Sequence, residues 1–370
     1  MTTVQAAVVT SLHGPTEVRE VQIPDPEETG ILARVDVATL CGTDVHHWLG
    51  ELRPNGENLP YIPGHETAAI IEEIRGNRSD VLGRPLKKGD RVIANYPRCN
   101  HCYFCTVANQ PQLCPNGYSY GNYRCETYPF LLGGCSEMHY YPPGCDVVKI
   151  PDEVPSDLAA SAACALRTVI HGYERLGGIE PHETVLVQGA GPLGLYATAL
   201  ARDRGSAKVI VIGAPKSRLE VAKNWGADET LDLDDCPNQA DRRAWVLDRT
   251  NGLGPDIVVQ CASGLANPEG LDLVRRGGRV VAIGVGGAQI TLPSNIITVK
   301  GLQVNGVIGA LGRHFWKALE FLRTRSDRFD FSELLTGVYT LDQVGDALLA
   351  MERFEEVKAV VIPKVGNVRD

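Results

Sequence analysis

The sequence predicts an α/β protein in which a β-rich domain accompanies a doubly wound parallel sheet. Three observations support this prediction. Short segments of alternating apolar and polar residues fill the first part of the chain, and wholly apolar strands alternate with helices from about Leu166 onward. A glycine-rich turn, Gly189–Gly194, directly follows one of the apolar strands. Alternation with a period of two indicates half-buried strands, whereas uniformly apolar strands are buried beneath helices on both faces.

The first part of the chain resembles a loop-rich antiparallel domain in its pattern. Residues 4–40 contain alternating bursts such as Ala33–Val37, and similar segments follow at Thr67–Ile74, Asp90–Ala94 and Val147–Ile150. The later strands and helices are expected at Val185–Gln188, Leu195–Ala201, Lys208–Ile212, Asp256–Gln260, Arg279–Val285, Gln303–Val307, Phe315–Leu322, Leu341–Met351 and Lys358–Ile362.

Length and composition limit the organisation and the partners. With 370 residues, the chain can form two domains, and we expect boundaries at 1–165, 166–307 and 308–370, the last segment returning to the first domain. The net charge of −9 disfavours nucleic acid and anionic membrane surfaces, and no apolar run approaches the ~20 residues of a membrane span. Eleven cysteines without an apparent secretory signal favour metal ligands and reduced thiols, which predicts a cytoplasmic location.

The glycine-rich turn is typical of a dinucleotide-binding site in a Rossmann domain. Gly189 permits the tight turn, Gly191 lets the backbone approach a pyrophosphate, and Gly194 allows close contact between helix and strand. Pro192 and Leu193 lie between them, where the helix begins and its unpaired N–H groups face the phosphates. A strand before the turn and a helix after it make this motif more specific than its glycines alone.

Four cysteines within sixteen residues predict a metal-binding lobe. Their spacing is Cys99-x2-Cys102-x2-Cys105-x8-Cys114. Four thiolates suit a tetrahedral zinc ion and leave no ligand position open, so we predict a structural zinc that stabilises a lobe with little core of its own. An iron–sulfur cluster is the alternative use of the same ligands, and four unrelated buried thiols are the simplest alternative.

Two other segments combine metal-ligating and titratable side chains. The first segment follows an expected strand and reads Cys41-Gly-Thr-Asp-Val-His46-His47. The second places an imidazole beside a carboxylate and reads Pro63-Gly-His65-Glu66. A single histidine is more often a surface or hydrogen-bonded core residue, so neither segment identifies a site alone. Their occurrence beside a dinucleotide turn and a four-cysteine lobe indicates one.

Taken together, these motifs resemble the zinc-dependent alcohol dehydrogenases of the medium-chain dehydrogenase/reductase superfamily, over essentially the whole chain. Gly89-Asp-Arg-Val92 and Gly133-Gly-Cys-Ser-Glu137 add to the resemblance, whereas the spacing of eight residues before Cys114 departs from the more usual seven. The resemblance implies a GroES-like catalytic domain interrupted by a Rossmann domain, with the active site in the cleft between them. It also implies a catalytic zinc, besides the structural one, whose ligands are Cys41, His65, Cys164 and, by exchange, Glu66. Without the resemblance, Cys164 is equally well a small buried apolar residue.

The implied reaction is hydride transfer between an alcohol and NAD⁺ or NADP⁺, which yields an aldehyde or ketone. Two thiolates and one imidazole leave a fourth zinc position for water or the substrate oxygen. By resemblance, Thr43 takes the alcohol proton and passes it through the cofactor ribose to His46. Asp44 would orient His65, with a strand-end cap as its alternative role. A secondary or cyclic alcohol is preferred, since polyol recognition needs more convergent polar groups.

The second strand of the dinucleotide domain bears on the choice of cofactor. NAD-selective sites usually carry an acid at its end, but here the strand is followed by Gly213, with Lys216 and Arg218 within reach. We infer that the protein tolerates NADP⁺, and we expect Gly213→Asp to raise the Michaelis constant for NADP⁺. Arg218 has stacking or capping as its alternative role.

Several features leave alternatives open. The aromatic segment Tyr118–Leu132 either lines the substrate site or packs under a long loop, and His47, Trp48 and Asn95 could shape the same site. The rival functions are a zinc-free quinone or enone reductase and a nucleotide-binding protein without turnover. The apolar strand Gln303–Val307 could pair across a two-fold axis, and the resemblance implies a homodimer or homotetramer.

Overall fold

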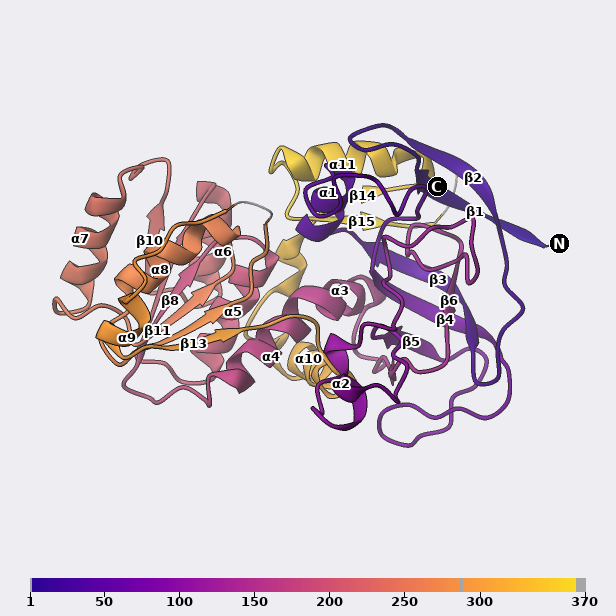
Figure 1. Ribbon diagram of the computed structural model, residues 1–370, viewed down its shortest axis with the longest axis horizontal. Coiled ribbons are helices and arrows are strands. Elements are labelled where there is room, and N and C mark those ends of the chain that lie inside the picture. The colour runs from indigo at the N-terminus through magenta and orange to yellow at the C-terminus, as the bar shows by residue number, and fades with distance from the viewer. Residues whose placement is uncertain (1, 287–288, 364–370) are drawn as a thin grey trace. The chain divides into compact units, whose positions relative to one another are not determined.

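The computed structural model describes residues 2–286 and 289–363. Its internal contacts divide the chain into two units. The first is assembled from Met1–Arg167, Gly309–Ser326 and Phe331–Asp370, and the second from Thr168–Ile308 and Asp327–Asp330 (Figure 1). Among the described residues, no helix has both the length and the apolar character needed to cross a bilayer.

The first unit is mainly β structure. Its strands are β1 (Thr3–Val9), β2 (Thr16–Gln22), β3 (Ile31–Thr39), β4 (Glu66–Ile74), β5 (Arg91–Ala94), β6 (Met138–Tyr141), β7 (Val147–Lys149), β14 (Leu335–Tyr339) and β15 (Lys358–Val361). β1 and β2 form a hairpin, and the larger sheet has the order β14-β15-β3-β4-β5-β7, with β6 also paired to β3. All these pairs are antiparallel except β14 with β15. The order puts β15, from the end of the chain, beside β3 near its beginning.

The period-two pattern of β3 supplies two cores at once. Leu32 belongs to one apolar cluster, whereas its neighbours Ile31 and Ala33 belong to another. Successive side chains of a strand point to opposite faces, so this strand is buried on both sides. The helices of the first unit are α1 (Gly42–Trp48), α2 (Tyr103–Thr106), α3 (Ser156–Ser161), the π-helix η2 (Ala162–Leu166), α10 (Gly312–Arg325), α11 (Val344–Glu352) and the 3₁₀ turns η1 (Pro111–Leu113), η4 (Phe331–Leu334) and η5 (Leu341–Gln343).

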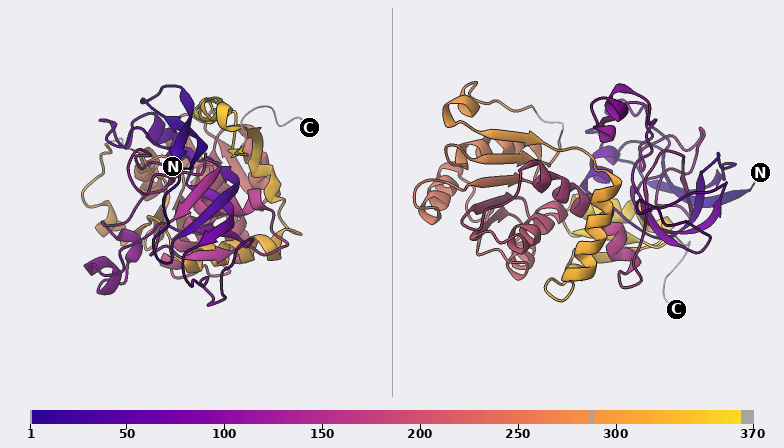
Figure 2. Two further views of the ribbon diagram at one scale, coloured as in Figure 1. Left: turned by 90° about the vertical axis from the view of Figure 1, so that its right-hand side faces the viewer. Right: turned by 90° about the horizontal axis from the view of Figure 1, so that it is seen from below.

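The second unit is a doubly wound parallel sheet with helices on both faces (Figure 2). Its strands are β8 (Thr184–Gln188), β9 (Lys208–Gly213), β10 (Glu229–Asp232), β11 (Ile257–Gln260), β12 (Arg279–Ala282) and β13 (Gln303–Gly306). Their spatial order is β10-β9-β8-β11-β12-β13, which is the strand order of dinucleotide-binding sheets. Helix α4 (Arg167–Arg175) begins at the boundary of the units, and the other helices are α5 (Pro192–Asp203), α6 (Lys216–Asn224), α7 (Gln239–Arg249), η3 (Gly264–Ala266), α8 (Asn267–Leu273) and α9 (Ile296–Lys300).

The fold class predicted from the sequence is confirmed, with differences at particular elements. The strand expected at Arg279–Val285 ends at Ala282, and Val285 is exposed. β10 was not expected, because Glu229-Thr-Leu-Asp232 is short and half polar. Helix α1 was also missed, since Gly42 and Thr43 are poor helix formers and only capping reveals its start.

Candidate active site

The start of α1 fixes Cys41 and Asp44 together. Cys41 is the N-cap, and its Sγ accepts the backbone N–H of Thr43 at 3.3 Å. Asp44, in the first turn, accepts the Cys41 N–H with Oδ2 at 2.9 Å. This reciprocal arrangement is a capping box, which satisfies donors that a helix otherwise leaves unpaired. The cap expected as an alternative role for Asp44 is therefore present.

Asp44 also holds His65. Its Oδ1 lies 3.2 Å from His65 Nδ1 and accepts the Gly64 N–H at 3.0 Å. Gly64 has φ +87°, and a Cβ there would approach Cys135 Sγ to 3.2 Å, so glycine suits this turn. Although burial opposes it, the positive charge of His65 holds the pKa of Asp44 below its usual value. The pKa of His65 lies well above its usual value. Burial opposes this rise in pKa, whereas the Asp44 carboxylate favours the charged imidazole.

Cys164 comes to the same place from the π-helix η2. The ligand atoms of Cys41, His65, Glu66 and Cys164 all lie within 4.8 Å of one another, and Cys41 Sγ is 3.3 Å from His65 Nε2. A hydrogen bond between the two thiols raises the pKa of Cys41 and lowers that of Cys164. Two hydrogen-bonded thiols beside a buried imidazole form a donor set that suits zinc with three protein ligands. Single turns of π-helix are frequent at functional sites.

Glu66 is fully buried and only partly satisfied. One oxygen, Oε2, accepts hydrogen bonds from Thr39 Oγ1 and Lys358 Nζ, whereas Oε1 has no partner among the described residues. Burial raises the pKa of Glu66 to about 7, against the effect of the Lys358 charge. Sheet register explains the contacts, since β3 pairs Thr39 with Glu66 and β15 pairs Val360 with Thr39. An unpaired buried carboxylate oxygen beside two thiols and an imidazole is compatible with a fourth, exchangeable ligand.

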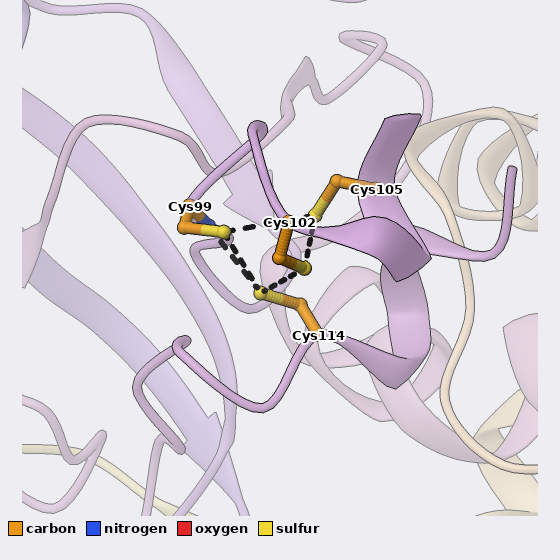
Figure 3. A group of neighbouring side chains, drawn as sticks. All are labelled: Cys99, Cys102, Cys105 and Cys114. Atoms are coloured by element: carbon orange, nitrogen blue, oxygen red, sulfur yellow. Dashed lines mark hydrogen bonds between the residues drawn. The ribbon is translucent and has the colours of Figure 1, made fainter. Parts of the chain in front are cut away.

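The four-cysteine lobe forms a second donor set (Figure 3). Its Sγ–Sγ distances are 3.5 Å for Cys99–Cys114, 3.6 Å for Cys102–Cys105, 3.8 Å for Cys102–Cys114 and 4.0 Å for Cys99–Cys105. Tetrahedral zinc with bonds of about 2.3 Å requires sulfurs about 3.8 Å apart, so the set fits this ion. The backbone N–H of His101 leads the contacts that lower the pKa of Cys99 to about 5. Neither α2 nor η1 buries a residue, so this lobe has little apolar core.

The two residues expected to move the proton lie on α1. Thr43 and His46 are three positions apart, and such positions are neighbours on a helix surface. His46 Nδ1 lies 2.5 Å from Glu51 Oε2, and both side chains are partly exposed. Glu51 was not anticipated, because it follows the helix in an unremarkable polar turn.

Each glycine of the dinucleotide turn is favoured there for a different structural reason. Gly189 has φ +102°, in the left-handed region. A Cβ on Gly191 would meet nothing within 4 Å, which leaves this backbone open to a ligand, whereas a Cβ on Gly194 would lie 1.8 Å from the Gly189 oxygen. Helix α5 begins at Pro192, followed by Leu193. The open backbone at a helix N-terminus fits a pyrophosphate.

Gly213 ends β9 beside this turn. A Cβ there would lie 2.8 Å from the backbone nitrogen of Ala190, so packing against the turn requires a glycine. An aspartate would displace the turn for either cofactor, so the predicted rise in the Michaelis constant for NADP⁺ stays a prediction and should extend to NAD⁺. Lys216 pairs with Asp235 at 3.0 Å and is exposed, whereas burial lowers the pKa of Arg218.

Of the other residues considered for the substrate site, Asn95 lines a recess beside the candidate metal centre. This recess is lined by His65, Ala94, Asn95, Tyr96, Ala163, Arg167, Ala310 and Phe315. Trp48 is buried in a core cluster and donates to the Gly14 carbonyl, and His47 bonds Asn122. The aromatic segment supplies core packing, as Tyr120 contacts Tyr96 and Tyr141.

Sequence reasoning missed Lys358, Thr39 and Arg167 at this centre. A signal existed for two of them, because Lys358 opens an otherwise apolar strand and Arg167 follows Cys164 in an otherwise apolar helical stretch. A charge in such a context is either exposed or paired inside. Thr39 carried no signal, since threonine is common in strands.

Comparisons with known proteins agree with these features. Residues 27–152 match the alcohol dehydrogenase GroES-like domain family, and residues 192–324 match the zinc-binding dehydrogenase family. The chain is 32% identical to 5-exo-hydroxycamphor dehydrogenase of Pseudomonas putida, covering 93% of this chain and 95% of the relative. It is 31% identical to an alcohol dehydrogenase of Geobacillus stearothermophilus, over 86% of this chain and 88% of the relative.

Solved structures give the same relationship. An alcohol dehydrogenase from Thermotoga maritima superposes with a TM-score of 0.90 at 33% identity, covering 98% of this chain and all of the other. A zinc-binding dehydrogenase from Sinorhizobium meliloti bound to NADP superposes with a TM-score of 0.83 at 26% identity, covering 98% and 100%. With its paired donor sets and dinucleotide turn, the chain belongs to the zinc-dependent alcohol dehydrogenases of the medium-chain dehydrogenase/reductase superfamily, which use zinc and NAD(P).

Proposed function

We propose that this NAD(P)-dependent alcohol dehydrogenase oxidises a secondary or cyclic alcohol at the centre formed by Cys41, His65 and Cys164. The observation that carries the proposal is the convergence of these side chains and Glu66, with ligand atoms within 4.8 Å of one another. When bound, zinc supplies a Lewis acid that lowers the pKa of the alcohol, and NAD(P)⁺ accepts the hydride.

The side chains around this centre have separate tasks. Asp44 keeps the Nδ1 proton of His65 in place, which leaves Nε2 as the ligand atom. Thr43 accepts the alcohol proton, and His46 carries it toward solvent, where Glu51 binds Nδ1. Thr39 and Lys358 hold one Glu66 oxygen, so that the other oxygen faces the ligand set. The Cys99, Cys102, Cys105 and Cys114 lobe holds a structural zinc.

The two rival functions are disfavoured by the same centre. A zinc-free quinone or enone reductase does not require two buried thiols around an imidazole. A protein that only binds nucleotide does not require the Thr43–His46 pair. The iron–sulfur alternative for the cysteine lobe is disfavoured by sulfur spacings that match a single tetrahedral ion.

The proposal is tested by metal analysis with a panel of alcohols. We expect two zinc ions per chain and reduction of NAD⁺ or NADP⁺ with a secondary or cyclic alcohol, followed by nicotinamide absorbance. Cys41→Ser should abolish turnover at an unchanged melting temperature, and Cys236→Ser, outside both donor sets, should keep full activity. A chain with one zinc, or a wild type without turnover on any alcohol, would contradict the proposal.

We also propose a cytoplasmic homodimer or homotetramer. The edge position of β13 supports self-association, and eleven cysteines without a disulfide among the described residues support a reducing compartment.

A further inference from the structure

The recess beside the candidate metal centre contains a buried arginine, Arg167, whose positive charge contributes to the lowered pKa of the Cys164 thiol. The recess has about 210 Å³ of free space, counting space open to solvent, and its polar lining consists of His65, Asn95, Tyr96 and Arg167. Three alanines and Phe315 complete it. Arg167 is 5% exposed, so its guanidinium has left bulk water.

Among the described residues, Arg167 donates one hydrogen bond and forms one cation–π contact. Its Nε donates to the Ala163 carbonyl at 2.9 Å, and its guanidinium carbon lies 5.3 Å from the centre of the Phe315 ring. No carboxylate of the described residues forms a salt bridge with it. A guanidinium has five N–H donors, and a buried one is costly unless it meets acceptors.

Most acceptor atoms of the neighbouring side chains are already engaged, with Glu66 Oε1 as an exception. Asp44 binds His65 and two backbone N–H groups, and Glu66 binds Thr39 and Lys358. Asn95 forms two hydrogen bonds with Asp146, through Nδ2 at 2.8 Å and Oδ1 at 2.6 Å. A ligand in the recess can therefore supply further acceptors to the guanidinium of Arg167.

We propose that Arg167 binds a carboxylate of the substrate, so that the enzyme prefers short secondary hydroxy acids over neutral alcohols. The inference rests on the proposed function and refines its substrate class. Arg167 and the ligand His65 line the same small recess, so the carboxylate lies within a few bonds of the carbon that loses hydride. A guanidinium matches a carboxylate through two parallel hydrogen bonds, which explains an arginine here better than a lysine.

The test compares 3-hydroxybutanoate with butan-2-ol, two secondary alcohols on one four-carbon skeleton. Wild-type enzyme should show a kcat/KM for the acid at least about tenfold above that for the alcohol. Methyl 3-hydroxybutanoate, which keeps the carbonyl but lacks the charge, should behave like butan-2-ol. An ester used as well as the acid would overturn the assignment, since it would mean recognition of a neutral acceptor.

Variants assign the preference to this side chain. Arg167→Met keeps length and packing on Phe315, and should lower the acid-to-alcohol ratio of kcat/KM about 10- to 100-fold. Arg167→Lys keeps the charge but loses the paired donors, so it should retain part of the preference. Arg323→Met on α10 removes one exposed cation and should leave the ratio unchanged. Circular dichroism and melting temperature show whether each variant is folded.

Failure of this inference is distinguishable from failure of the proposed function. Good turnover of neutral alcohols without a preference for the acid would overturn the role of Arg167 and leave the dehydrogenase intact. Binding of butanoate, followed by calorimetry, gives a readout independent of turnover. An equal affinity of wild type and Arg167→Met for butanoate would overturn the inference, and a loss of affinity in the variant would support it.

Discussion

Asp44 links the helix cap to the metal centre. Its side chain is inaccessible to solvent, and its two oxygens serve the Cys41 N–H, the Gly64 N–H and His65. A residue with these contacts sets both the start of α1 and the orientation of the imidazole. The position of Cys41 and the tautomer of His65 therefore depend on one carboxylate.

Asp44→Asn should lower the zinc affinity of this centre about 10- to 100-fold, because the amide keeps the shape but loses the charge that orients His65. Competition with a chelator, read by metal analysis, measures the effect. Asp80→Asn is the control, since Asp80 is also buried but, among the described residues, accepts hydrogen bonds from its own loop and from Arg84. Equal zinc loss in both variants would mean general destabilisation.

His139 makes stability depend on pH. It is fully buried between Tyr120 and Tyr141, and neither ring nitrogen has a partner among the described residues. Burial lowers its pKa to about 3, from 6.5. Below pH 6.5 His139 becomes protonated in the unfolded chain but stays neutral in the folded chain. The free energy of unfolding therefore falls as the pH drops from 6.5 toward 3.

His139→Phe should remove this dependence, since phenylalanine keeps an aromatic ring between the tyrosines. Between pH 7 and pH 5 the wild type should lose about 2 kcal/mol more unfolding free energy than the variant. Urea unfolding at the two pH values measures the difference. Parallel pH profiles for the two proteins would show that His139 does not titrate in this way.

The cysteine lobe has little packing of its own, and we propose that a metal ion holds it. α2 and η1 bury no residues, and Tyr103 and Val107 are exposed. Without an apolar core, we expect the free energy that keeps the lobe folded to come from metal binding by its four cysteines.

Cys102→Ser should reduce the zinc content from two ions to one per chain and lower the melting temperature by more than about 5 °C. Metal analysis and calorimetry measure both quantities. Cys125→Ser, which changes a buried thiol outside the lobe, should keep both ions. An unchanged melting temperature for Cys102→Ser would exclude a structural role for the lobe zinc.

The end of β9 and the glycine-rich turn pack without room for a side chain. Gly213→Ala should raise the Michaelis constants for NAD⁺ and NADP⁺ alike, because the added Cβ would displace Ala190 and the turn that follows Gly189. Steady-state kinetics with both cofactors measure this. Gly306→Ala, where a Cβ meets nothing within 4 Å, is the matched control. A change confined to NADP⁺ would instead restore Gly213 as a position that discriminates the cofactors.

For the whole protein, an unpaired strand at a sheet edge is the strongest indication of self-association. β13 ends the six-stranded sheet, and Val304 and Ile308 are 40% and 64% exposed. Apolar edge strands offer free backbone groups to a second copy. We therefore propose that this edge serves assembly.

Val304→Lys should convert the oligomer to monomers, because lysine on an edge strand opposes strand pairing. Light scattering during size-exclusion chromatography measures the mass. Val338→Lys, the same change on the exposed edge strand β14, should leave the mass unchanged. A wild-type monomer would contradict both the assembly and the role of β13.

Local sequence patterns were sufficient to predict the fold class, the dinucleotide turn and the four-cysteine lobe. Strand periodicity, the Gly189–Gly194 spacing and four thiols within one short loop depend on residues that are neighbours in the chain, so the sequence displays them directly. His65 and Cys41 could be suspected for the same reason, since each stands in a compact motif.

Contacts between distant parts of the chain could be identified only from the tertiary structure. Lys358 reaches Glu66 across 292 residues, because the register of β15 on β3 and of β3 on β4 brings their ends together. The same holds for Cys164, which the π-helix carries to the thiol of Cys41, and for Arg167 beside it. Sheet register and helix packing are collective outcomes of many weak interactions, and no single stretch of sequence specifies which side chains they bring into contact.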